Sequence, residues 1–169
     1  MNFRYLTAAL FLSFSVFTFA QDEVEVIKVT PEEADAKFGF GNYEGALDDY
    51  QNLLAQDPKN EKYNYKVAVC YLNTNSDKSK AIPYLEYITH KPKSDPNALY
   101  LLGRAYHYAN RFDEAIATYT KFKTAGKGTE FNLKDADRQI QYCINAKELM
   151  KYPVNVTFES LGEKVNSSY

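Results

Sequence analysis

Small residues recur along this chain at a spacing of 34 to 35 positions, and this repeat restricts its fold more than any other feature of the sequence. Each repeat holds one small residue and a second small residue 12 or 13 positions later. These pairs are Ala34 with Ala46, Ala68 with Ala81, and Gly103 with Ala115. Two helices can approach closely only where small side chains meet, while larger residues fill the space around the contact. The pattern therefore predicts three pairs of antiparallel helices that stack one after another.

A period near 34 with small and aromatic residues in step resembles the tetratricopeptide repeat (TPR), over roughly residues 31–125. The matched large residues are Tyr50, Leu85 and Tyr119, followed by Leu53, Ile88 and Phe122. The usual first-helix Trp is absent, with Asn64 and Leu99 in its place. Lys37 stands in the first repeat where the later repeats have Tyr71 and Tyr106. The resemblance implies an all-α solenoid of about three repeats, at 31–60, 61–95 and 96–128.

A further helix is expected after the repeats, at 129–152. Apolar residues from Leu133 to Met150 follow helical spacing, and Pro153 ends the run. We expect this helix to cap the open apolar face of the third repeat. The preceding Ala125-Gly126-Lys127-Gly128 predicts a flexible connection.

Residues 153–169 have a different pattern. Val154, Val156 and Phe158 alternate with polar residues, as is typical of a half-buried β-strand. A lone strand needs a sheet from elsewhere. The stretch resembles the start of a β-propeller in Gram-negative envelope proteins that combine a TPR array, a propeller and an OmpA-like domain, some of them linked to type IX secretion. This resemblance implies that further domains, including a peptidoglycan-binding one, follow Tyr169.

The first 20 residues match a cleavable secretory signal peptide. Arg4 supplies a positive charge, Leu6–Phe19 is an uncharged apolar run, and Ala20 is a small residue at the expected cut. A membrane anchor is the alternative, but 14 apolar residues are fewer than the roughly 20 that span a bilayer. We expect a mature chain with an N-terminal lead at 21–30 and no transmembrane segment, located in the periplasm or at the outer membrane.

The net charge of the chain limits its possible partners, and its cysteine content limits its possible disulfide chemistry. The whole chain has a net charge of −2 and no basic stripe, which argues against nucleic-acid binding. Cys70 and Cys143 both fall on apolar sides of helical patterns, which predicts buried thiols. A disulfide between them is the alternative in an oxidising compartment.

No group of residues has the pattern of an active site, a metal site or a cofactor site. His90 lies in a predicted exposed turn, and His107 has no second ligand at a suitable spacing. Gly39-Phe40-Gly41-Asn42 is a turn between two helices rather than a phosphate-binding loop. The sequence therefore predicts a protein that is not an enzyme.

TPR geometry implies a groove lined by the first helix of each pair. The residues expected to face that groove include Tyr, Arg and Asn, and tyrosine and arginine are frequent anchors at protein interfaces. They are Asp35, Phe38, Lys62, Tyr65, Val69, Asn73, Asn97, Tyr100, Arg104, His107 and Tyr108.

These patterns predict a non-catalytic periplasmic scaffold that docks a peptide or protein partner in an outer-membrane or type IX secretion-associated complex. One alternative is a structural spacer that positions a β-propeller and a peptidoglycan-binding domain. A second alternative is an accessory domain of a larger hydrolase.

Overall fold

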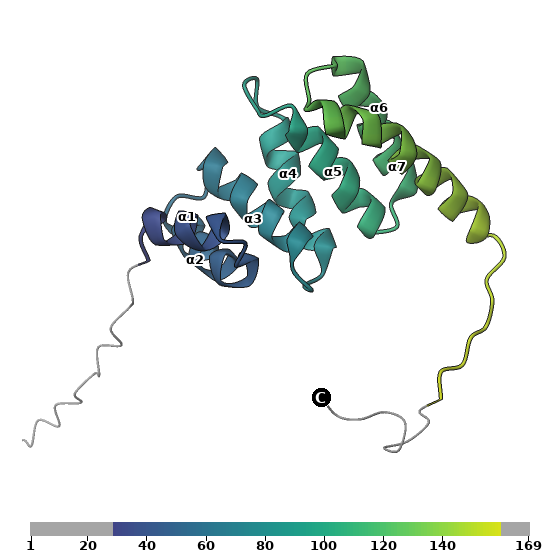
Figure 1. Cartoon of the computed structure of the whole chain (residues 1–169), viewed down its shortest axis with the longest axis horizontal. Coiled ribbons are helices and arrows are strands. Elements are labelled where there is room, and N and C mark those ends of the chain that lie inside the picture. The colour runs from purple at the N-terminus through teal and green to yellow at the C-terminus, as the bar shows by residue number, and fades with distance from the viewer. Residues whose placement is uncertain (1–28, 160–169) are drawn as a thin grey trace, which may run out of the picture.

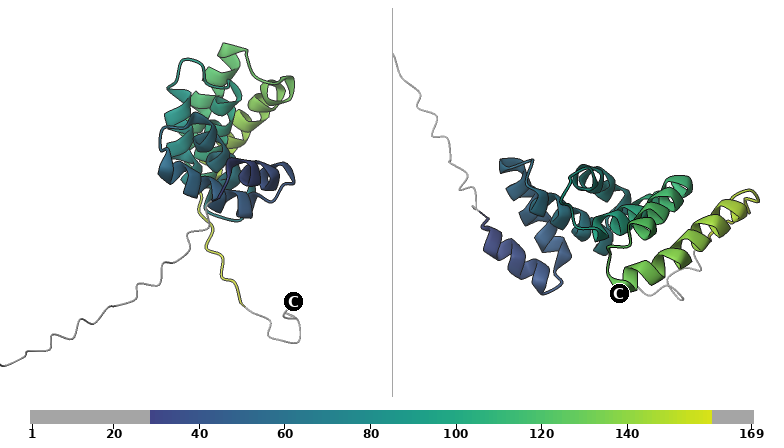
Figure 2. Two further views of the ribbon diagram at one scale, coloured as in Figure 1. Left: turned by 90° about the vertical axis from the view of Figure 1, so that its left-hand side faces the viewer. Right: turned by 90° about the horizontal axis from the view of Figure 1, so that it is seen from above.

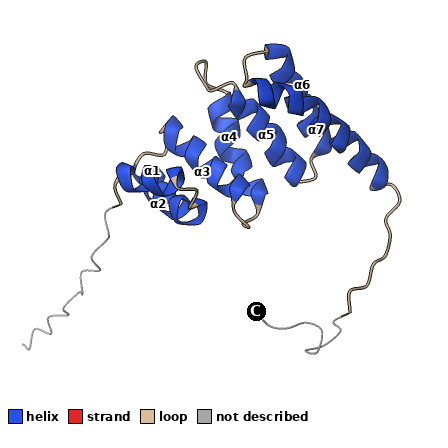
Figure 3. Ribbon diagram, viewed as in Figure 1, coloured by secondary structure: helices blue, strands red, loops and turns tan. Residues whose placement is uncertain are grey.

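The computed structural model describes residues 29–159, which form seven α-helices, one short 3-10 helix and no strand (Figures 1 and 3). The all-α prediction is confirmed for this part of the chain. The helices are α1 (Pro31–Gly39), α2 (Tyr43–Gln56), α3 (Glu61–Asn73), α4 (Ile82–Thr89), α5 (Asn97–Tyr108), α6 (Phe112–Ala125) and α7 (Glu130–Leu149). The 3-10 helix η1 (Lys78–Ala81) leads directly into α4.

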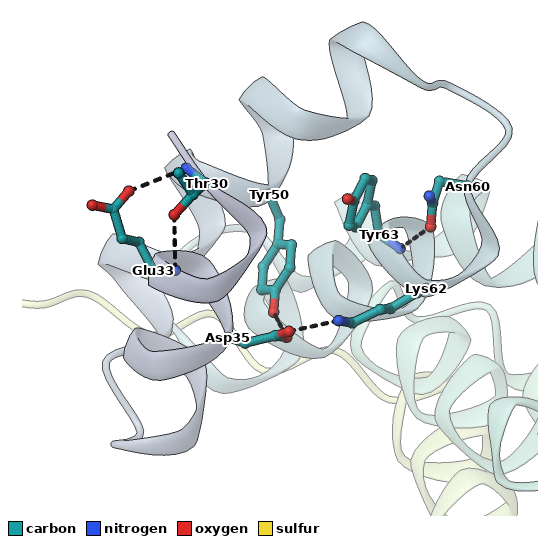
Figure 4. Close-up of polar contacts among 7 residues, drawn as sticks. All are labelled: Thr30, Glu33, Asp35, Tyr50, Asn60, Lys62 and Tyr63. Atoms are coloured by element: carbon teal, nitrogen blue, oxygen red, sulfur yellow. Dashed lines mark hydrogen bonds and ion pairs between the residues drawn. The ribbon is translucent and has the colours of Figure 1, made fainter. Parts of the chain in front are cut away.

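Capping residues explain where several of these helices begin. Thr30 and Glu33 form a reciprocal capping box at the start of α1, where Pro31 takes the first helical position. Asn60 accepts a hydrogen bond from the Tyr63 backbone N–H at the start of α3 (Figure 4). These side chains satisfy backbone donors that have no partner inside the helix.

Successive helices pack against one another, so the helix pairs line up along the molecule (Figures 1 and 2). The predicted small residues lie at the contacts: Ala34, Ala46, Ala68, Ala81 and Ala115 are 0% exposed, and Gly103 is buried. Helices α5 and α6 pack closely at Gly103, where an added Cβ would lie 2.7 Å from the ring of Tyr119. The repeat deduced from the sequence is therefore the packing pattern of the core.

A recurring hydrogen bond joins each repeat to the one before it. The Tyr71 hydroxyl on α3 accepts from the Gln51 side-chain amide on α2 at 2.7 Å. One repeat later, the Tyr106 hydroxyl on α5 donates to Glu86 on α4 at 2.6 Å. Lys37, at the equivalent position of α1, pairs instead with Asp49 of its own repeat at 2.7 Å.

Helix α7 packs against α6 and α5 as the first helix of a further repeat would. Its Ala136 follows Gly103 by 33 positions and is 0% exposed, as is Cys143. The Asn97 side-chain oxygen accepts from the Thr129 backbone and the Asn132 side chain, both at 2.9 Å. The predicted flexible connection at 125–128 is therefore a tight turn, and Asn97 holds the end of it that leads into α7.

Gly126 and Gly128 each serve that turn in a different way. Gly126 ends α6 in the left-handed region, with φ of 61°, where glycine is not strained. A Cβ at Gly128 would lie 2.1 Å from the ring of Phe122, so only glycine fits. The two glycines provide close packing and a sharp reversal rather than mobility.

Both cysteines are free and buried, which confirms the prediction of two thiols. Burial raises the pKa of Cys70 to about 12 and that of Cys143 to about 11. Both thiols are therefore protonated near neutral pH, and a protonated buried thiol reacts slowly.

The predicted C-terminal strand is not present in the described part of the chain. Val154, Val156 and Phe158 lie in an irregular segment and are 81%, 63% and 93% exposed. A strand needs a neighbouring edge for its backbone groups, and no strand among residues 29–159 provides one. The predicted signal peptide at 1–20 and the tail beyond residue 159 lie outside the described residues.

Candidate partner-binding surface

The predicted groove residues lie on α1, α3 and α5. We call the face formed by these helices and α7 the first-helix face. The residues on it fall into two clusters with different chemistry. One lies between α1 and α3 around Asp35, and the other lines a cavity between α5 and α7.

Asp35 is the centre of the first cluster (Figure 4). It accepts hydrogen bonds from the Tyr50 hydroxyl and, at 2.5 Å, from the Lys62 ammonium group. The hydrogen bond from Lys62, followed by that from Tyr50, lowers the pKa of the Asp35 carboxyl below its ordinary value. Asp35 and Lys62 therefore neutralise each other, which ties α3 to α1.

Phe38 and Lys66 extend this cluster. The Lys66 ammonium group lies 3.6 Å from the centroid of the Phe38 ring, a cation–π contact. Desolvation lowers the pKa of Lys66 despite the nearby charge of Asp35. Lys66 was not among the predicted groove residues, although it follows Lys62 by one helical turn.

The predicted residues in the middle of the face are less accessible to a partner. Tyr65 and Val69 are half-buried. Asn73 is exposed, and its side-chain amide donates to the Val69 carbonyl at 2.7 Å. Asn97 serves mainly to hold the α6–α7 turn, as described above.

The second cluster lines a cavity of about 380 Å³ between α5 and α7. Four predicted residues come together there: Tyr100, Arg104, His107 and Tyr108. The opposite wall comes from α7 and consists of Phe131, Asp135, Arg138 and Gln139, which the sequence interpretation missed. We call this space the α5–α7 cavity.

Tyr100 and Asp135 form the buried part of the cavity and are each 6% exposed. The Tyr100 hydroxyl donates to Asp135 at 2.6 Å, Gln139 donates to the same oxygen at 2.9 Å, and Arg138 pairs with the other oxygen. Burial alone would raise the pKa of Asp135, but these three hydrogen bonds outweigh it and hold the pKa below its ordinary value. Asp135 is therefore ionised with both oxygens occupied.

Arg104, His107 and Tyr108 form the more accessible wall. The Arg104 guanidinium carbon lies 5.9 Å from the centroid of the Tyr108 ring, and Tyr108 is 51% exposed. Among residues 29–159, Arg104 has no ion-pair or hydrogen-bond partner. Desolvation lowers the pKa of His107, so its imidazole is neutral at neutral pH.

Tyr100 thus differs from the other predicted residues of α5. It packs against Tyr119 and Phe122, with ring centroids 5.8 and 5.7 Å away. Burial, with the hydrogen bond to Asp135, raises its pKa to about 12. Tyr100 forms the floor of the cavity and holds Asp135 in place.

The side chains in these two clusters are suited to binding a partner. Guanidinium groups beside exposed aromatic rings suit recognition of a polar or anionic group with an apolar neighbour. Within the described ranges, no group of His, Cys, Asp and Glu side chains is arranged to hold a metal ion. Within the same residues, no helix combines the length and apolar content needed to cross a bilayer.

Comparisons with known proteins agree with this architecture. Residues 41–122 match the family described as anaphase-promoting complex, cyclosome, subunit 3. The crystal structure of the Sgt2 TPR domain from Aspergillus fumigatus is similar, with a TM-score of 0.54 and 21% sequence identity. That similarity covers 81% of this chain and 95% of the Sgt2 chain. A search of curated proteins gave no match.

The fold and these similarities define the class: the chain carries a TPR-like repeat domain. TPR domains generally mediate protein–protein interactions, and the fold is typically a non-catalytic scaffold that binds protein or peptide partners.

Proposed function

We propose that this protein is a non-catalytic scaffold of the bacterial cell envelope that docks a protein partner across its first-helix face. The observation that supports this most directly is the α5–α7 cavity, where Arg104 lies beside the exposed ring of Tyr108 and has no ion-pair partner among residues 29–159. Phe131, 71% exposed, adds apolar area on the opposite wall. Exposed aromatic and arginine side chains around a recess are typical anchors for a partner.

Location in the periplasm or at the outer membrane rests on the signal-peptide pattern of residues 1–20. Participation in an outer-membrane or type IX secretion-associated complex rests on the resemblance to multidomain envelope proteins. The proposal that the protein also has a domain that binds peptidoglycan rests on the same resemblance.

Co-purification from envelope extracts tests the docking function. Arg104→Ala combined with Tyr108→Ala should weaken capture of the partner by roughly 2 kcal/mol or more, because both anchors of the accessible wall are lost. Lys121→Ala is a matched control, since Lys121 is an exposed cation on the second helix of the same repeat. Both variants should melt close to the wild type. Unchanged capture by the double variant, with an intact fold, would contradict the proposal.

A structural spacer is the second candidate, and one observation favours it. Beyond the packed part of α7, Leu149, Met150, Tyr152, Val154, Val156 and Phe158 are all more than half exposed. Such residues would be covered if the segment paired with a sheet of a following domain. Hydrogen exchange on the protein purified from envelopes distinguishes the two candidates. Protected backbone amides at 154–158 favour the spacer, while exchange as fast as in the isolated chain argues against it.

A further inference from the structure

Helix α7 is the last helix in the row, and one side of it is exposed (Figures 1 and 2). Its buried residues include Ala136 and Cys143, on the side that packs against α6. The last element of a repeat array normally has a polar outer face, because no further repeat covers it. On α7, however, Phe131, Tyr142 and Leu149 are 71%, 50% and 73% exposed. The end of this array therefore carries apolar area of the kind that another surface covers.

These three apolar side chains lie on one line along α7. They are separated by 11 and 7 residues, which are close to whole numbers of helical turns. Arg138 falls on the same line, seven residues after Phe131 and four before Tyr142. We call the line formed by Phe131, Arg138, Tyr142 and Leu149 the α7 stripe. Phe131 and Arg138 also line the α5–α7 cavity, so the stripe runs from that cavity to the C-terminal end of α7.

The order of residues in the stripe suits pairing with a second copy of itself. Phe131 and Leu149 each lie nine residues from position 140, and Arg138 and Tyr142 each lie two residues from it. Two copies of α7 placed antiparallel about that point would bring Phe131 against Leu149 of the second copy. They would also bring Arg138 over the ring of Tyr142, where a guanidinium group makes a cation–π contact. Such a contact is two-fold symmetric, so each of these pairs occurs twice.

The charges beside the stripe favour the same antiparallel arrangement. Lys134 and Glu148 lie on the same flank of the stripe, six and eight residues from position 140 and on opposite sides of it. Each Lys134 would therefore lie next to Glu148 of the second copy, about 3 Å out of exact register. Within one copy these groups pair with Glu130 and Lys151 on exposed side chains, so their present pairs are weak and can be exchanged. A parallel pair would instead place Arg138 against Arg138, and these charges repel.

We infer that α7 is a self-association surface, on which a second copy of this chain docks antiparallel along the α7 stripe. This inference goes beyond the proposed docking of another protein. The second copy's Leu149 would lie against Phe131, so each copy would complete the rim of the other's α5–α7 cavity. The residues that follow α7 do not cover the stripe as far as residue 159. They include Pro153, have no regular structure and are exposed.

Disulfide trapping in the full chain tests the antiparallel arrangement. Phe131→Cys and Leu149→Cys are prepared as separate proteins of different mass, mixed and oxidised. The mixture should give a disulfide-linked dimer of the two different chains. Leu149→Cys alone should not, because the two copies of residue 149 would be 18 residues of helical rise apart, about 27 Å, which no disulfide spans. The native thiols of Cys70 and Cys143 are buried and do not compete.

Sedimentation velocity of the full chain measures the dimer without a crosslink. Tyr142→Gln should raise the Kd of the dimer about tenfold or more, because both copies lose apolar contact and the cation–π contact with Arg138. Ile144→Gln is the matched control. Ile144 is 46% exposed but lies on the far side of α7 from the stripe, so its replacement should leave the Kd unchanged.

A charge swap tests the flank of the stripe. Glu148→Lys should raise the Kd about tenfold, because each Lys134 then meets a like charge in the second copy. Adding Lys134→Glu restores opposite charges, so the double variant should dimerise like the wild type. A double variant no better than Glu148→Lys alone would contradict the antiparallel register.

A chain that stays monomeric, with no disulfide in the mixture, would overturn the inference and leave another protein or a following domain as the occupant of the stripe. A disulfide formed by each variant alone but not by the mixture would overturn the antiparallel arrangement. The docking function is tested separately, because Arg104 and Tyr108 do not lie on the stripe. Unchanged co-purification by their double variant would contradict docking and leave the dimer standing.

Discussion

Tyr50 and Tyr119 occupy the same position in the first and third repeats, but their hydroxyl groups have different surroundings. Tyr50 and Tyr119 are both 0% exposed. The Tyr50 hydroxyl donates to Asp35, whereas the Tyr119 hydroxyl has no hydrogen-bond partner among residues 29–159. A buried polar group without a partner costs about 1–3 kcal/mol. The repeat pattern fixes where each ring lies, and the residues around it decide whether its hydroxyl is stabilising.

The two positions should therefore respond in opposite directions to the same change. Tyr50→Phe should lower the free energy of unfolding by about 1–2 kcal/mol, because Asp35 loses a donor. Tyr119→Phe should leave it unchanged or raise it by about 1 kcal/mol, because an unsatisfied hydroxyl is removed. Urea unfolding of both variants measures this. Equal destabilisation by the two changes would show that Tyr119 has a partner.

Helix pairs are the scale at which the sequence was most informative. The positions of Ala34, Ala68 and Gly103 predicted the closest contacts because only small side chains permit two helices to approach. Every one of these positions is buried in the structure. Spacing alone therefore located the packing faces of α1 to α6.

The cavity wall on α7 was missed for a physical reason. The apolar spacing of α7 predicts a helix that caps the third repeat, and a capping helix has no first-helix positions of its own. The 33-residue step from Gly103 to Ala136 was the signal that could have placed Asp135, Arg138 and Gln139 on the face of the array. The burial of Tyr100 was also missed, because it depends on Asp135, 35 residues away. The turn at Gly128 was misread because close packing and flexibility both favour glycine.

The crossing of α5 and α6 gives a test of the pairing. Gly103→Ala would normally stabilise a helix by about 1 kcal/mol. Here the new Cβ would meet the buried ring of Tyr119, so we expect a net loss of about 1–3 kcal/mol from overpacking. Thermal or urea unfolding measures the change.

Two further variants control this experiment. Gly39→Ala adds a Cβ to α1 where no atom lies within 4 Å, so it should not destabilise. Adding Tyr119→Leu to Gly103→Ala should restore part of the loss, since the second repeat pairs Ala68 with Leu85 at the same positions. Destabilisation by Gly39→Ala equal to that of Gly103→Ala would argue against a steric cause.

The molecule as a whole is a row of helix pairs that places two chemically different clusters on one face. Asp35 and Lys62 neutralise each other in the first cluster and tie α1 to α3. The α5–α7 cavity holds the Arg104 guanidinium group, which has no ion-pair partner within the described part of the chain, next to exposed aromatic rings. Under the proposed function, the N-terminal end of the face supplies rigidity and its C-terminal end contacts the partner.

Site-specific photo-crosslinking in the intact envelope tests this assignment most directly. A photoreactive phenylalanine analogue replaces Tyr108 beside the cavity in one variant and exposed Lys121 on α6 in another. The account predicts a discrete crosslinked protein from position 108 and none from position 121. No crosslink at position 108, or the same product from both positions, would contradict docking on the first-helix face.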